Sequence, residues 1–160
     1  FLLIFPFEYP EILILEMSTN RPGDMKYLTD FIKVDIGIIT EISASQIEFS
    51  KTLNEKSLAI LNADNEYVAK MKNHVKARVM TLGFSEEAEM KSTDIYSGEE
   101  FEGLSFKLNY KGSSVPVRLN NISEKSQIYP ALTAAAVGVE LGLNLVEISE
   151  ALGFLSLPEE

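Results

Sequence analysis

Glu16 is the residue of this sequence best placed to do chemistry. It comes directly after the apolar run Ile12–Leu15, which has the length and composition of a buried β-strand. The segment that follows, from Met17 to Asp24, contains Asn, Pro and Gly and is typical of a turn before a helix. This order predicts a carboxylate at the carboxyl edge of an α/β sheet, where open parallel sheets bind their ligands.

Further polar side chains follow a second predicted strand. Asn62 and Asp64 come after the apolar run Ala59–Leu61, and we expect them to form a strand end, an Asx-type turn and a helix cap. His74 is the only histidine, so it has no second histidine with which to bind a metal. We expect it at the end of a helix, on the protein surface.

The composition excludes several classes of function. The sequence contains no cysteine, which excludes disulfides and thiolate chemistry and makes a cytoplasmic location the default expectation. Its formal net charge is −10, and this charge opposes binding to DNA or RNA. The acidity is compatible with a site that meets nucleotide phosphates through Mg²⁺, because that ion prefers carboxylate oxygens.

The 160 residues, 46% of them hydrophobic, predict a single domain with an ordinary buried core. The apolar start Phe1–Phe5 is followed at once by Pro6 and Glu8. It is much shorter than the roughly 20 residues of a membrane-spanning helix, and it lacks the pattern of a signal peptide. Because the chain begins with Phe1, we expect an upstream part of the gene product to be missing.

Strands and helices are predicted to alternate in the first half of the chain, which indicates parallel strands joined by crossovers. After Ile12–Leu15, we expect a helix that is capped by Asp24 and packs on the sheet through Tyr27, Leu28, Phe31 and Ile32. The remaining elements expected here are, in order, a strand over 34–40, a strand over 59–61, a helix over 66–75 and a strand over 78–82.

The pattern changes after Gly83. Apolar and polar residues alternate over 104–110 and again over 115–119, with turn residues between them, which predicts an antiparallel hairpin. An Ala-rich helix is predicted over 129–141, and Asn144 with Glu147 predicts a capping box before a last helix. The fold class is therefore α/β: a Rossmann-like, mainly parallel sheet flanked by helices, with an antiparallel β-hairpin extension.

Four stretches of the sequence carry a resemblance to a known family. They are Glu-Met-x-x-x-x-Pro-Gly-Asp over 16–24 followed by Tyr-Leu, Ile-Ile-Thr over 38–40, Leu-Asn-Ala-Asp-Asn over 61–65, and the segment 131–145. Together they resemble the middle, ATP-binding domain of the Mur ligases, nearest the D-alanyl-D-alanine-adding branch. The resemblance implies that residues 1–155 form this domain without its N-terminal phosphate-loop portion, and that residues 156–160 begin a linker to a C-terminal domain that is absent here.

The resemblance also implies a function and a metal site. Mur ligases pass the γ-phosphate of ATP to a carboxylate, and an amine then attacks the acyl phosphate to form an amide. Glu16 matches the family's magnesium ligand, and Gln46 stands where a second metal-side motif has histidine, with Glu41 in place of an asparagine. Lys56 is the nearest match to the family's catalytic lysine. Glu16 and Lys56 are also compatible with simple solvated charges at the ends of elements.

The same resemblance implies a nucleotide contact before the Ala-rich helix. Ser126, Gln127 and Pro130 occupy a motif that in the family reads Gly-x-His-Asn-x-x-Asn, so Ser126 replaces the histidine and Pro130 the second asparagine. No phosphate-binding loop of the form G-x-x-x-x-G-K-[ST] occurs in the 160 residues.

Two hypotheses follow. The chain is a fragment of an ATP-dependent amide-bond ligase of peptidoglycan precursor synthesis, which uses ATP, Mg²⁺ and a UDP-linked peptide in the intact protein. Alternatively, it is a non-catalytic pseudo-ligase or structural module that has kept the fold and lost the nucleotide site. On either hypothesis, we expect no nucleic-acid or membrane partner, and we expect this chain alone to bind neither ATP nor Mg²⁺ usefully.

Overall fold

The computed structural model describes residues 10–17, 24–40, 44–98, 101–120, 122 and 124–154. The helices and strands in these ranges are, in chain order, α1 Asp24–Asp30, β1 Ile36–Ile39, α2 Ala44–Thr52, β2 Leu58–Asn62, α3 Glu66–Met71, β3 Arg78–Gly83, β4 Met90–Gly98, β5 Phe101–Tyr110, β6 Ser113–Asn120, the 3-10 turn η1 Lys125–Gln127, α4 Ile128–Glu140 and α5 Leu145–Gly153. None of the described helices is long and apolar enough to cross a membrane.

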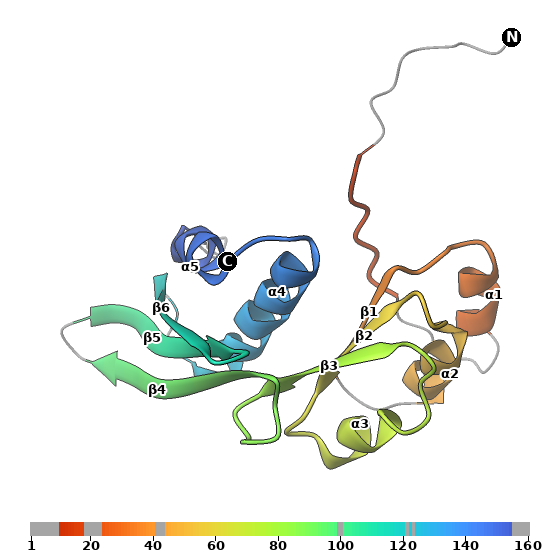
Figure 1. The fold of residues 1–160 in the computed structure, drawn as a ribbon, viewed down its shortest axis with the longest axis horizontal. Coiled ribbons are helices and arrows are strands. Elements are labelled where there is room, and N and C mark those ends of the chain that lie inside the picture. Colours follow the sequence, from red (N-terminus) through yellow and green to blue (C-terminus); the bar gives the residue numbers. More distant parts are fainter. Residues whose placement is uncertain are drawn as a thin grey trace, which may run out of the picture.

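The six strands form one mixed sheet, in which they lie in the order of the sequence. β1, β2, β3 and the start of β4 are parallel, whereas β4, β5 and β6 are antiparallel. Figure 1 shows the two halves side by side, with α1, α2 and α3 beside the parallel half and α5 beside the antiparallel half. α4 packs on β3 and β4, where the two halves meet. The expected α/β fold with a mainly parallel first half and an antiparallel extension is confirmed.

Short apolar strands build the parallel half. In β2 the residues Leu58 to Leu61 are all fully buried, which is typical of a parallel strand covered on both faces. α3 covers one face through Val68 and Met71, and the Asn65 side chain caps it by accepting hydrogen bonds from two backbone N–H groups. The expected helix over 66–75 is shorter than predicted, because the backbone after Met71 closes into tight turns.

The predicted hairpin is the connection between β5 and β6. Tyr110 and Ser113 face each other across the turn, and Lys111 and Gly112 between them both have positive φ, at 48° and 79°. Two such residues form the type I′ turn that matches the twist of antiparallel strands. The alternating apolar residues of both strands lie in the larger of the two cores.

α4 and α5 complete that core. Leu132 and Ala135 of α4 are fully buried. The predicted capping box at the start of α5 is present: the Asn144 side chain accepts from the N–H groups of Val146 and Glu147, and the Glu147 carboxylate accepts from the Asn144 N–H. This box satisfies backbone donors that no residue within the helix can reach.

The strand expected over Ile12–Leu15 is not formed. The segment lies outside the six-stranded sheet, and its side chains are exposed, from 46% at Leu15 to 85% at Ile14. A β-strand needs a neighbour that satisfies its backbone N–H and C=O groups. The run has the composition of a strand, but it pairs with no neighbouring strand among the described residues.

The apolar face predicted for the first helix is also exposed. Tyr27 and Phe31 of this region touch edge to face, with ring centroids 5.1 Å apart, yet they are 65% and 75% exposed. α1 packs against α2, and the expected burial of its apolar face on the sheet is wrong. The helix lies beyond β1, the last strand on this side among the described residues, so no strand lies beneath the face.

Candidate functional site

The carboxyl ends of β1, β2 and β3 lie at one edge of the sheet. Ile39 is level with Leu61, and Asn62 is level with Leu82. Thr40 follows β1, Asn62 is the last residue of β2, and Asp64 comes two positions later. This edge is where open α/β sheets bind ligands.

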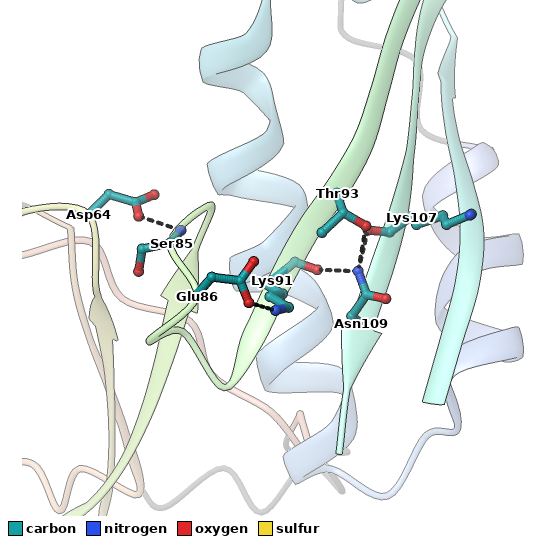
Figure 2. A network of polar contacts seen from close by, with 7 residues as sticks. All are labelled: Asp64, Ser85, Glu86, Lys91, Thr93, Lys107 and Asn109. Atoms are coloured by element: carbon teal, nitrogen blue, oxygen red, sulfur yellow. Dashed lines mark hydrogen bonds and ion pairs between the residues drawn. The ribbon is translucent and has the colours of Figure 1, made fainter. Parts of the chain in front are cut away.

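Asp64 is the centre of the polar contacts at this edge. One carboxylate oxygen, Oδ2, accepts from the Phe84 N–H at 2.7 Å and from the Tyr129 hydroxyl at 2.9 Å. The other, Oδ1, accepts from the Ser85 N–H at 2.9 Å (Figure 2). The Asn62 side chain in turn accepts from the Asp64 N–H at 3.0 Å. Three donors thus hold this one carboxylate in place.

Gly83 makes this arrangement possible. It ends β3 with a φ of 155°, and a Cβ built on it would lie 2.6 Å from Asp64 Oδ2. That distance is far inside van der Waals contact, so any side chain here would displace the carboxylate. Because residue 83 is glycine, the Asp64 carboxylate can reach the N–H groups of Phe84 and Ser85.

Two aromatic rings and a lysine continue the cluster. Phe84 and Tyr129 pack edge to face with centroids 4.8 Å apart, and the Lys125 ammonium lies 4.5 Å above the Phe84 ring centroid. Burial raises the pKa of Tyr129 to about 12, and the hydrogen bond and charge of Asp64 add to this rise. Tyr129 is therefore a neutral hydrogen-bond donor over the whole physiological pH range.

A small cavity lies between the strand ends and α4. Its volume is about 30 Å³, and it is lined by residues of β1, β2, β3 and α4 together with Thr40, namely Ile38, Ile39, Thr40, Ile60, Asn62, Leu82, Tyr129 and Thr133. Such a volume accommodates about one or two water molecules. Tyr129, the hydrogen-bond partner of Asp64, forms part of the wall of this cavity.

A second contact network fixes the antiparallel half next to this edge. Asn109 of β5 donates through Nδ2 to the carbonyl of Lys91 at 3.3 Å and to the Thr93 hydroxyl at 3.0 Å, both on β4. Lys91 also forms an ion pair with Glu86, in the loop after β3 (Figure 2). This loop is therefore held at Phe84 and Ser85 by Asp64 and at Glu86 by Lys91.

A wider groove lies far from the strand ends, between β5, β6 and α5. Its volume is about 820 Å³, and its lining includes Lys107, Asp94 and Arg118. Lys107 and Asp94 form an ion pair at 2.7 Å. The groove is open and belongs to the half of the molecule without the polar strand ends, so it is not a candidate active site.

The structure does not bring the predicted metal and catalytic residues together. Glu16 is exposed and directly follows the segment Ile12–Leu15, which lies outside the sheet. Gln46 lies in α2, but its side chain is outside the described residues, as is the whole of Glu41. Lys56 is exposed at the amino end of β2, opposite the end that leads to Asp64. No group of three or more His, Cys, Asp or Glu side chains suited to a metal occurs in the described part of the chain.

The three residues predicted for the nucleotide contact lie beside the Asp64 cluster. Ser126 is exposed, and its hydroxyl donates to the Glu124 carboxylate at 3.1 Å. Gln127 is half-buried and precedes α4 without capping it through its side chain, and Pro130 is exposed in the first turn of that helix. They share one turn with Lys125 and Tyr129. Their role as nucleotide contacts stays a prediction.

The sequence patterns did not reveal the link between Asp64 and Tyr129. Asp64 was expected to serve only a turn and a helix cap; the Asx turn is confirmed, but Asn65 is the residue that caps α3. The two linked side chains are 65 positions apart, and no local spacing predicts such a contact. The nearest signal was the glycine at position 83, directly after an apolar strand.

The sequence is similar to known proteins over most of its length. A family model described as Mur ligase middle domain matches residues 3–138. The UDP-N-acetylmuramoyl-tripeptide–D-alanyl-D-alanine ligase of Mycobacterium leprae is 26% identical over 166 residues, which cover 89% of this chain and 32% of the relative. The UDP-N-acetylmuramoyl-L-alanyl-D-glutamate–2,6-diaminopimelate ligase of Chlamydia trachomatis serovar D is 29% identical and covers 77% of this chain and 25% of the relative. The chain thus spans about a third or less of these proteins.

Solved structures of similar proteins have the same fold. The MurF ligase from Thermotoga maritima in complex with ADP superposes with a TM-score of 0.77 at 18% identity, over 94% of this chain and 38% of that protein. MurF from Acinetobacter baumannii gives a TM-score of 0.73 at 18% identity, over 86% of this chain and 32% of that protein. Because the family model matches most of the sequence and the fold agrees, the chain belongs to the Mur ligase middle domain family.

Proposed function

We propose that this chain is a fragment, the middle-domain part, of an ATP-dependent ligase that forms an amide bond in peptidoglycan precursor synthesis. The observation that carries the proposal is the match of residues 3–138 to the Mur ligase middle domain. The relatives described above are named as ligases of UDP-linked muramoyl substrates, and one structural neighbour was solved with ADP. We place the reaction in the cytoplasm, with a nucleotide and a UDP-linked peptide as its small-molecule partners.

The proposed reaction has two steps. The γ-phosphoryl group of ATP is first transferred to a substrate carboxylate, which gives an acyl phosphate and ADP. The amine of the incoming amino acid or dipeptide then attacks the acyl carbon, and an amide forms as phosphate leaves. The D-alanyl-D-alanine-adding branch is our choice among the possible amines, because two MurF structures and the Mycobacterium leprae relative point to it.

We expect the described residues, as arranged, to bind neither Mg²⁺ nor ATP usefully. Mg²⁺ binds through one or two carboxylates together with phosphate oxygens, but both oxygens of Asp64 already accept protein hydrogen bonds and Glu16 is exposed outside the sheet. The 160 residues also contain no G-x-x-x-x-G-K-[ST] loop that would bind the triphosphate through backbone N–H groups and a lysine. The proposed activity therefore needs further parts of a ligase.

Isothermal titration of the chain with Mg-ATP tests this dependence. We expect no measurable heat from a folded sample. A dissociation constant in the low micromolar range corresponds to about −8 kcal/mol. If such binding were observed and Glu16→Ala abolished it, the chain would hold a complete nucleotide site by itself, and the dependence on further parts would be wrong.

A chimeric enzyme tests the proposed reaction. Residues 12–154 replace the matching part of the Thermotoga maritima MurF ligase, which keeps its own phosphate-binding loop and outer domains. We expect ADP release that requires both the UDP-linked peptide and D-alanyl-D-alanine, and we expect Glu16→Ala in the chimera to remove it. A folded chimera without turnover would favour the non-catalytic alternative, especially if Ser126→His with Pro130→Asn restored activity.

A further inference from the structure

Asp64 joins three segments of the chain that are far apart in the sequence. Its carboxylate accepts from the N–H groups of Phe84 and Ser85, which follow β3, and from the hydroxyl of Tyr129, in the first turn of α4. These donors are 20, 21 and 65 positions away from Asp64. One side chain at the carboxyl edge of the sheet therefore determines how the loop after β3 and the start of α4 lie relative to each other.

The Asp64 carboxylate is itself held in place. The Asn62 side chain accepts from the Asp64 N–H at 3.0 Å, which closes an Asx turn. The carboxylate also packs against the backbone of Gly83, where a Cβ would come within 2.6 Å of Oδ2. It is thus a fixed point to which other segments of the chain are attached.

The turn η1, Lys125–Gln127, precedes α4 and has no buried residue. Its described hydrogen bonds are local: the Gln127 N–H donates to the Glu124 carbonyl at 3.0 Å, and the Ser126 hydroxyl donates to the Glu124 carboxylate at 3.1 Å. Ile128, directly after the turn, is fully buried in the larger core. Burial of an apolar side chain is non-directional, so Ile128 holds the turn on the sheet but does not by itself fix its orientation.

Two routes connect this turn to Asp64. The first is the Tyr129 hydroxyl, which donates to Asp64 at 2.9 Å. The second is Phe84: its N–H donates to the same carboxylate, and its ring contacts both Tyr129 and the Lys125 ammonium. Hydrogen bonds to a carboxylate are strong and directional, so they supply the orientation that the burial of Ile128 leaves open.

α4 has a second polar contact with the parallel half at its other end. Glu140, the last residue of the helix, forms an ion pair with Arg78, the first residue of β3. This pair lies at the amino end of β3, whereas the Asp64 contact lies at the carboxyl edge, where open α/β sheets bind ligands. The Arg78–Glu140 pair is therefore a matched control: it attaches the same helix to the same half, away from the candidate site.

We propose that Asp64 is a positioning residue of the ligase site: through Tyr129 and Phe84 it fixes the turn η1 at the carboxyl edge. The inference rests on the proposed function, in which this turn carries Ser126 and Gln127, the residues predicted to contact the nucleotide. Asp64 acts through its neighbours, since both of its oxygens accept hydrogen bonds from the protein. A turn that is not fixed in advance must be ordered when the nucleotide binds, so loss of the contact weakens binding rather than slowing the chemical step.

Amide hydrogen exchange of the 160-residue chain tests this contact directly. The N–H groups of Gln127 and Ile128 donate within the turn, so their exchange reports its opening. Tyr129→Phe keeps the ring and removes only the hydroxyl that donates to Asp64. We expect exchange at both groups to become at least about tenfold faster, the effect of losing one hydrogen bond to a charged group. The control Glu140→Gln, which weakens the contact at the other end of α4, should leave this exchange unchanged.

Two outcomes of the exchange experiment would overturn the proposal. Unchanged exchange of the turn in Tyr129→Phe would show that the turn opens without breaking its contact with Asp64. Equal acceleration in Tyr129→Phe and Glu140→Gln would show that these N–H groups report the stability of the whole helix and not the position of the turn.

Steady-state kinetics of the chimeric enzyme separates positioning from a purely structural role. Asp64→Ala and Tyr129→Phe should each raise the KM for Mg-ATP at least about fivefold, with kcat within about twofold of the parent chimera. The double variant should have the KM of Asp64→Ala alone, because Tyr129 acts through Asp64. Glu140→Gln should change neither constant.

The kinetic outcomes that contradict the proposal are equally specific. A fall in kcat at unchanged KM would overturn it, since destabilisation alone reduces the active fraction and not the affinity for ATP. Additive increases in KM would also overturn it, because Tyr129 would then act independently of Asp64. A chimera without any turnover would count against the proposed function, and the exchange experiment would still decide whether Asp64 fixes the turn.

Discussion

The two halves of the sheet differ in how completely they are packed. In the antiparallel half, β4, β5, β6 and α5 pack with α4 around one large core, and Met90, Leu108 and Leu132 are fully buried in it. This core extends beneath α4 to Leu58 and Ile60 of β2 and to Met80 and Leu82 of β3. On its other face the parallel half has a smaller core. Its outer strand β1 pairs with no further strand among the described residues, and apolar residues of the α1 region, Tyr27 and Phe31, are exposed. The parallel half, whose strands end at the edge where α/β sheets bind ligands, is thus the less completely packed half.

This difference indicates that stability and chemistry are divided between the halves. β4, β5, β6, α4 and α5 supply most of the residues of the larger core, and burial of apolar area is the main favourable term in folding. The parallel half supplies the polar strand ends. Asp64 and Tyr129 join the two, since the first follows β2 and the second belongs to α4. Four predictions test this division between the halves, in order of decreasing expected effect.

The largest effect is expected in the antiparallel half. Leu132→Ala removes a fully buried side chain of α4 and should lower the free energy of unfolding by about 2–5 kcal/mol, through lost burial and the cavity that remains. Phe31→Ala is the counterpart in the parallel half. Because Phe31 is 75% exposed, its loss should change stability by at most about 0.5 kcal/mol. Urea unfolding measures both, and similar effects would show that the halves are equally packed.

Gly83→Ala should destabilise the junction between the halves. The new Cβ meets Asp64 Oδ2 at 2.6 Å, and the φ of 155° is unfavourable for alanine. We expect a loss of about 1–3 kcal/mol in the free energy of unfolding, measured by urea unfolding. Gly112→Ala is the control for backbone strain alone, because its Cβ would meet nothing within 4 Å. A smaller loss at Gly83 than at Gly112 would contradict the role assigned to Asp64.

The Asp64–Tyr129 contact should make stability depend on alkaline pH. The pKa of Tyr129 is raised from 10.0 to about 12 in the folded protein, so the unfolded chain releases this proton at lower pH. The stabilisation is therefore fully present below pH 10 and is lost as the pH rises towards about 12. Urea unfolding at several pH values should show this fall. Asp64→Asn should reduce it without removing it, because burial is the larger cause, and Tyr129→Phe should abolish it.

The smallest effect is expected at the start of α5. Asn144→Ala removes the acceptor for two backbone N–H groups and should cost about 1 kcal/mol. Asn144→Asp keeps a good capping side chain and is the control, with little change expected. Thermal unfolding measures both variants. If Asn144→Ala were as costly as Leu132→Ala, the cap rather than core packing would dominate the antiparallel half.

Local patterns in the sequence were sufficient for most of the antiparallel half. Period-two alternation placed β5 and β6, and Lys111 with Gly112 formed the turn between them. The Asn144 and Glu147 pair predicted the start of α5. These features could be predicted because each depends on residues within a few positions of one another. β4 was not predicted, and its pairing with β5 is interrupted by register shifts after Thr93, which weakens any simple alternation.

The apolar segments, most turns and caps, and the family of the chain could be identified from the amino-acid sequence. Three features could be seen only in the tertiary structure. Tyr129 donates a hydrogen bond to Asp64, Lys56 lies at the end of β2 opposite to Asp64, and Ile12–Leu15 lies outside the sheet. The physical reason is that caps and turns are satisfied by near neighbours in the chain, whereas a strand and a buried polar pair need partners that only folding brings into reach.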